Sequence, residues 1–280
     1  MRVSVCVGNY AKTPYCIPGL EIEVYCMEEL CYCMQENAFL LDLSVMNDQL
    51  LVWIERECGL KELAGALHPL VHRQGSLSMF VTAILRYVGW GDEASVNETE
   101  QAIRQGAGLS GIEKRKSQID FLVEKKKYKA ALQGYEDLLR EWQGQEPESG
   151  KIPAREFLAR IWHNKGVACA GLMLYDRAAE CFRQAYDLQG GPEDCQAYLA
   201  AKRMGLSEED YVAFAGEHGE WYSQTLELEK KLERAMDEWE QQPDYLRLYH
   251  RRELRSSDRR QFYEDNERLT QALKERYRME

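Results

Sequence analysis

One segment of the chain repeats itself, and this repeat constrains the fold more than any other feature. Residues 127–139 align with residues 174–186 at a constant offset of 47 positions. Self-similarity at such a period indicates stacked units, each of which buries its apolar face only against its neighbours. The matched positions are Tyr128 and Tyr175, Ala131 and Ala178, and Tyr135 and Phe182.

The residue types in the repeat are those of closely packed helix pairs. Alanine and glycine allow two helices to approach closely, and the aromatic side chains fill the space between neighbouring pairs. In the second unit, Trp162, Gly166 and Ala168 supply the matching first helix. We expect a third pair over residues 193–203 and 208–218.

This pattern resembles the tetratricopeptide repeat family. The resemblance is close for residues 162–186 and weaker for residues 115–139, where Arg115, Gln118 and Ile119 replace a large aromatic residue, a leucine and a glycine. The period is also longer than the family's usual spacing of about 34 residues. Together the units cover roughly a third of the chain.

The resemblance implies a superhelix whose inner surface, lined by the first helices, binds an extended peptide or a partner helix. Lys116, Arg160 and Asn164 could together bind a carboxylate, since cations and amides suit that group. Mixed charges in the same row are instead typical of a general protein-binding groove. The residues mapped to this groove are Lys116, Asp120, Val123, Glu124, Arg160, His163, Asn164 and Val167.

The flanking sequence predicts two further regions and an essentially all-α protein. Alternation at Val3, Val5 and Val7, and again at Ile22 and Val24, indicates a short β element. Helical spacing of apolar residues takes over from Met27. We predict a helical N-terminal domain over residues 1–105, helical repeats over 106–205, and a C-terminal helical hairpin over 206–280.

The C-terminal region carries a heptad-like seam. Apolar residues from Trp221 to Trp239 recur at intervals of three and four, and Pro243 then interrupts the pattern before a second polar helix. Such a hairpin would either cap the repeats or form the seam of a homodimer.

The bulk composition excludes some classes of partner. The hydrophobic content of 45% suits a folded protein, and the net charge of −11 argues against nucleic acid as the main partner. An odd number of cysteines, nine, predicts reduced thiols in a cytoplasm. No signal peptide is recognisable, and the longest uncharged apolar stretch, residues 75–85, is too short to span a membrane.

Several short motifs suggest chemistry, but each has a simpler structural interpretation. Residues 106–111 match the dinucleotide-binding glycine pattern, yet no buried strand precedes them, so a flexible linker is expected. Cys16, Cys26, Cys31 and Cys33 lack the paired spacing of a structural zinc site. His68 and His72 lie four residues apart without the glutamate of a zinc protease, and Pro69 intervenes.

The candidates for catalysis are equally weak. Cys169 and Cys181 lie near His163 in the alignment, but at positions where the repeat packs its helices, so burial explains them. We therefore predict no catalytic residue, no metal and no cofactor, and a protein that acts as an adaptor or scaffold.

A transcriptional regulator is the second hypothesis. Residues 58–64 have a sequence pattern similar to that of a helix-turn-helix, a module that accompanies such repeats in peptide-sensing bacterial regulators. The segment after it is apolar and contains Pro69, whereas a recognition helix presents polar and basic side chains. An arginine-rich stretch over residues 247–260 could bind single-stranded nucleic acid, although nearby acidic residues indicate an ordinary solvated helix.

Overall fold

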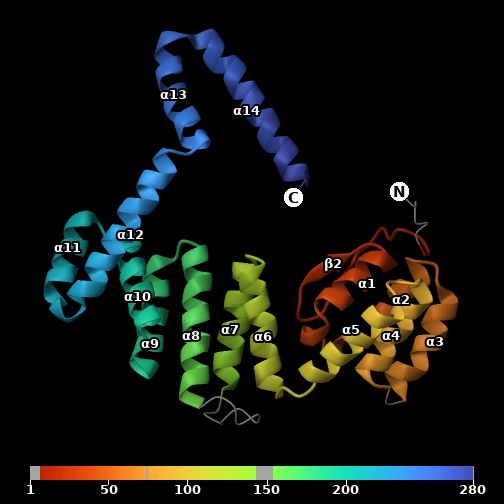
Figure 1. The fold of residues 1–280 in the computed structure, drawn as a ribbon. Coiled ribbons are helices and arrows are strands. Elements are labelled where there is room, and N and C mark those ends of the chain that lie inside the picture. Colours follow the sequence, from red (N-terminus) through yellow and green to blue (C-terminus); the bar gives the residue numbers. More distant parts are fainter. Residues whose placement is uncertain (1–6, 74, 143–153, 280) are drawn as a thin grey trace. The chain divides into compact units, whose positions relative to one another are not determined.

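The protein is built almost entirely from helices. A computed structural model describes residues 7–73, 75–142 and 154–279, which contain one two-stranded sheet and a series of helices (Figure 1). The chain divides into two compact units, residues 1–207 and 208–280. Among the described residues, no helix combines the length and the apolar character that crossing a membrane requires.

The short β element is a hairpin. Strand β1 (Tyr15–Ile17) pairs antiparallel with β2 (Ile22–Val24), and Tyr15 lies opposite Val24. Gly19 adopts φ +77° in the connecting turn, a conformation that favours glycine. The strand predicted at Ile22 and Val24 is confirmed, whereas the alternation at Val3 and Val5 lies outside the described residues.

Several N-terminal helices begin at side-chain caps of the residue types that favour this position. Ser76 accepts a hydrogen bond from the Met79 amide, and Asn47 and Asp92 cap two other helices in the same way. A core of fully buried aliphatic and aromatic side chains fills the space between them. The elements are α1 (Met27–Glu36), η1 (Ala38–Leu40), η2 (Leu43–Val45), α2 (Asp48–Arg56), α3 (Lys61–His72), α4 (Leu77–Val88) and α5 (Glu93–Gly106).

The central helices form the first two predicted pairs, so the helix-pair fold that the resemblance to tetratricopeptide repeats implies is confirmed. The two helices of the third predicted pair belong to different compact units. In each of the first two pairs, the turn between the helices contains a residue with a left-handed backbone conformation. These residues are Lys126, with φ +57°, and Met173, with φ +61°. These two residues are 47 positions apart, like the rest of the repeat. The helices are α6 (Gly111–Glu124), α7 (Tyr128–Glu141), α8 (Ala154–Gly171), α9 (Tyr175–Gln189) and α10 (Pro192–Gly205).

The close approach expected at Gly166 is present. A Cβ atom at this position would lie 2.7 Å from Cε1 of Phe182 on α9. Ala178, Ala179 and Ala185 of α9 are buried in the same interface. Glycine at position 166 therefore sets the distance between α8 and α9.

The glycine-rich turn at residues 106–111 is a packing contact. Helix α5, and not a strand, precedes it, and a Cβ at Gly106 would lie 2.1 Å from the Phe39 carbonyl oxygen. Lys114 of α6 donates a 2.6 Å hydrogen bond to that oxygen. The turn thus lies inside the first compact unit, while the predicted three-domain division stays a prediction.

The second unit contains a broken C-terminal helix. Asp258 has an extended backbone and accepts a hydrogen bond from the Gln261 amide, so one predicted helix becomes two. Of the predicted heptad seam, Trp221 and Leu228 are buried, whereas Trp239 is half exposed. The elements are α11 (Glu208–Glu217), η3 (Gly219–Trp221), α12 (Tyr222–Glu240), α13 (Pro243–Ser257) and α14 (Arg259–Met279).

Candidate functional site

The candidate site is a depression where α6, α8 and the start of α10 meet. Its volume is about 610 Å³. Four of the eight residues mapped to the groove line it, and they come from two different first helices. The lining residues are Lys116, Ala159, Arg160, His163, Asn164, Gln189, Gly191, Pro192, Glu193 and Asp194.

Asp120 is the polar centre of this face. One of its oxygens accepts hydrogen bonds from the Tyr135 hydroxyl at 2.5 Å and the Asn164 amide at 2.8 Å. The other accepts from Lys116 Nζ at 2.6 Å. Because these donors belong to α6, α7 and α8, the carboxylate links three helices.

Tyr135 contributes as a neutral donor. Its side chain is fully buried, and burial together with the neighbouring Asp120 carboxylate raises the pKa of its hydroxyl. The phenol therefore keeps its proton and donates to Asp120 throughout the physiological pH range.

His163 joins α8 to α10. Its Nδ1 lies 2.6 Å from an oxygen of Asp194, and its ring meets Phe182 edge-on at a centroid distance of 5.2 Å. Asp194 is itself buried in the first turn of α10. His163 is thus fixed on both sides and shapes the wall of the depression.

Among the other residues mapped to the groove, Glu124 and Arg160 are exposed and the two valines are packed, and Glu124 does not line the depression. Arg160 pairs with Glu156 one turn away at 2.6 Å, and 53% of its side chain is exposed. Val123 and Val167 are partly buried and pack against the two apolar cores of the first unit. Neither valine lines the depression.

The charges of the site argue against a carboxylate clamp. Lys116 and Asn164 both point to Asp120, and Glu193 and Asp194 bring further negative charge. An incoming carboxylate would meet these acids before it met an unpaired cation. The geometry favours the second interpretation of the sequence, a groove of mixed charge.

Sequence reasoning missed the contribution of α10. Glu193 and Asp194 of α10 line the depression, together with Gln189 at the end of α9, although the repeat pattern maps the groove only to α6 and α8. The prediction of a third helix beginning at Glu193 was the available signal. A third first helix must follow the other two in a stack of such pairs.

The other sequence motifs do not assemble into chemistry among the described residues. No group of three His, Cys, Asp or Glu side chains there is placed to hold a metal. Cys26 caps α1 through its sulfur, while His72 pairs with Asp48 at 3.0 Å. Cys169 and Cys181 are both buried.

The dinucleotide pattern is also accounted for by capping. Ser110 accepts from the Glu113 amide, and the Glu113 carboxylate accepts from the Ser110 amide, which completes a capping box. The N–H groups that would bind a pyrophosphate in a dinucleotide site are therefore partly satisfied by the protein itself.

Comparisons with known proteins identify no family and no function for this chain. No family model matches the sequence, and no curated protein shows significant similarity to it. A solved structure described as "MamA RS-1 ArsTM double mutant" is similar with a TM-score of 0.32 and 12% identity, over 74% of this chain and 96% of that chain. At this distance the likeness supports no functional argument, and the helix pairs are established by the chain's own packing.

Proposed function

We propose that the protein is an adaptor or scaffold that binds an extended peptide or a partner helix on the face formed by α6, α8 and α10. The observation that carries the proposal is the depression in which three successive first helices contribute side chains to one surface. Grooves of this kind recognise a segment by many small contacts spread along its length.

The groove is held rigid by the hydrogen bonds described above. Asp120 and Asp194 each bond to a residue of α8, so the spacing of the three helices is fixed before a partner binds. A preorganised surface loses little conformational freedom on binding. Arg160, Gln189 and Glu193 are exposed and are the side chains through which we expect a partner to be recognised.

The regulator hypothesis gains no support from the geometry. Helices α2 and α3 do form a helix-turn-helix around Gly59, which has φ +74°. The exposed residues of α3 include one lysine, one glutamate and two histidines, and the others are small or apolar. They are Lys61, Glu62, Gly65, Ala66, His68, Pro69 and His72. A recognition helix requires more basic and polar side chains than this.

The cytoplasmic location and the homodimer through the C-terminal helices remain parts of the proposal. The location rests on the odd cysteine count. The dimer rests on the exposed apolar residues of α12 to α14, such as Met236, Trp239 and Leu246.

The experiment compares two sets of alanine substitutions on the same repeat. The groove variant carries Arg160→Ala, Gln189→Ala and Glu193→Ala, all at exposed positions. The control carries Glu180→Ala and Gln184→Ala on the exposed face of α9. Partners are captured from the native cell extract, identified by mass spectrometry, and then titrated as purified proteins.

The proposal expects a partner whose affinity falls at least tenfold for the groove variant and stays unchanged for the control. Hydrogen exchange on the complex should show protection in α6, α8 and α10. A partner that binds both variants equally, with protection elsewhere, would overturn the assignment of the groove. His163 and Asn164 are unsuitable probes because both hold helices together.

A further inference from the structure

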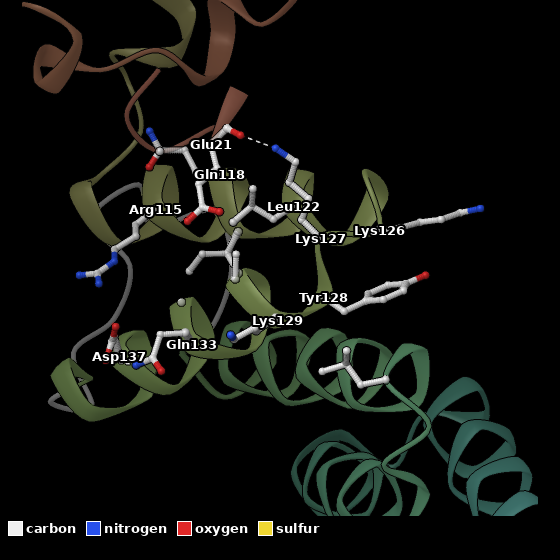
Figure 2. A pocket seen from close by; sticks show the side chains of 15 residues that line it. Glu21, Arg115, Gln118, Leu122, Lys126, Lys127, Tyr128, Lys129, Gln133 and Asp137 are labelled. Carbon is white, nitrogen blue, oxygen red and sulfur yellow. Dashed lines mark hydrogen bonds between the residues drawn. The ribbon is translucent and has the colours of Figure 1, made fainter. Parts of the chain in front are cut away.

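A second surface of the repeats carries a cleft that the proposed groove does not use. It lies between α6 and α7, beside the turn of the β hairpin, and has a volume of about 910 Å³ (Figure 2). Its central side chains, Ile119 and Leu122, are buried and apolar. The lining residues are Gly19, Glu21, Arg115, Gln118, Ile119, Leu122, Lys126, Lys127, Tyr128, Lys129, Ala130, Gln133, Gly134, Asp137 and Leu172.

The rim of this cleft is positive, although the chain as a whole carries a net charge of −11. Four cations line the cleft, against the carboxylates of Glu21 and Asp137. Asp137 already pairs with Arg140 at 2.9 Å. Two of the four cations, Lys126 and Lys127, lie in the turn between α6 and α7, where residues 125–127 are three consecutive lysines.

Two lysines that line the cleft are available to a partner. Lys126 and Lys129 are exposed, and among the described residues neither amino group has a hydrogen-bond or ion-pair partner. Figure 2 shows Lys126 extending away from the other labelled side chains, whereas Lys127 points to Glu21 and donates to its backbone oxygen. Arg115 is held by Glu141 at 2.5 Å. The turn therefore presents positive charge that the protein does not neutralise.

An apolar turn adjoins the basic one. The equivalent turn of the next helix pair contains Leu172, Met173 and Leu174 where the first has three lysines. All three side chains are exposed, and Met173 is 76% exposed. A Cβ at Gly171 would lie 2.5 Å from the Tyr128 ring, so the end of α8 packs directly on α7 and brings Leu172 into the cleft.

We propose that this cleft and the two turns beside it dock an acidic segment of another protein that carries an aliphatic anchor. The apolar floor and Leu172 would bind the anchor, while Lys126 and Lys129 would face flanking Asp or Glu side chains. Charge complementarity selects this partner, since the local excess of cations stands on an otherwise acidic molecule. A hollow floor suits an inserted side chain better than the flat surface of a membrane.

The test uses a synthetic peptide with a Leu-containing centre flanked by four glutamates, labelled with a fluorophore. Its binding to the full chain is followed by fluorescence anisotropy at low salt and at physiological salt. The cleft variant carries Lys126→Glu and Lys129→Glu. The control carries Lys61→Glu and Lys230→Glu, which remove the same charge from exposed lysines elsewhere.

The proposal expects the cleft variant to bind the acidic peptide at least tenfold more weakly than the control does, and Leu172→Ser to weaken binding as well. Affinity should fall as salt rises, because exposed charges are screened. Three results would overturn the proposal. These are equal affinities for the two charge variants, equal binding of a peptide with lysines in place of the glutamates, and binding to phosphatidylserine vesicles but not to the peptide.

Discussion

Ile119 on α6 packs directly against Gly134 on α7, where an added Cβ would lie 2.9 Å from the isoleucine side chain. In the next pair the glycine lies on the first helix instead, since Gly166 occupies the position equivalent to Ile119 and faces Phe182, which is equivalent to Tyr135. The first pair therefore keeps the close helix approach of the family even though it lacks the family's glycine on its first helix. The small residue has moved to the partner helix.

Gly166→Ala should destabilise the protein although alanine is the better helix former. The new methyl group would overlap the Phe182 ring, and overpacking costs about 1–3 kcal/mol, against a gain of up to about 1 kcal/mol in helix propensity. Urea unfolding should show a net loss. Adding Phe182→Leu should recover part of it, as a double-mutant cycle will measure.

The matched control is Gly65→Ala in the middle of α3. No atom lies within 4 Å of the position that a Cβ would take there, so only the propensity gain remains. This variant should be more stable than the wild type by up to about 1 kcal/mol. A stabilising effect at both glycines would contradict the close contact between α8 and α9.

Tyr135→Phe should remove the hydroxyl that donates to Asp120. Loss of a buried hydrogen bond to a charged acceptor costs about 1.5–3 kcal/mol of unfolding free energy. The folded state also raises the pKa of this phenol above its unfolded value of about 10, so its contribution is complete below that pH and is lost as pH rises further.

Unfolding measured at pH 8 and pH 10.5 will check the sign. The wild type should lose more stability over this interval than Tyr135→Phe does. Equal losses would show that the folded state does not raise the pKa of the Tyr135 hydroxyl.

Asn164→Ala and Arg160→Ala should have different effects on the stability of the protein, although both residues lie on the same face of α8. The first removes a 2.8 Å bond between α8 and α6 and should cost about 1–2 kcal/mol. The second truncates an exposed side chain and should change stability by no more than about 0.5 kcal/mol. Thermal melts of both variants decide whether Asn164 is a helix linker or a free groove residue.

Cys16 should react first with iodoacetamide among the described cysteines. It is exposed, whereas Cys31 and Cys58 are fully buried. Partial burial and the carboxylates of Glu21 and Glu23 raise its thiol pKa, so the thiolate is scarce at neutral pH and the rate should climb as pH increases.

Peptide mapping of the labelled, folded protein gives the order of modification, with Cys16→Ser as the control. Labelling of Cys31 or Cys58 before Cys16 would contradict the burial of the N-terminal core.

The sequence was informative wherever local chemistry decides the structure. The Ser76 cap, the strand at Ile22 and the 47-residue repeat were all predictable, because caps, alternation and periodicity are properties of neighbouring residues. The break at Asp258 was missed. Its side chain starts a new helix there, and the surrounding polar pattern does not reveal that choice.

The candidate site was only partly predictable. The alignment brought Lys116, Arg160, His163 and Asn164 to one face, and the structure places all four around one depression. The alignment could not show that Asp120 accepts a hydrogen bond from Asn164, because the two residues lie 44 positions apart in the sequence.

By itself, then, the sequence determined an all-α chain of stacked helix pairs, since side-chain size and periodicity act over a few residues. Only the tertiary structure decided which polar groups are already paired and which remain open to a partner. The way the helices pack brings Asp194 within hydrogen-bond distance of His163. The same packing leaves Lys126 without a carboxylate partner among the described residues. Which polar side chains pair over long sequence distances depends on how the helices pack, and that packing depends on interactions throughout the first unit.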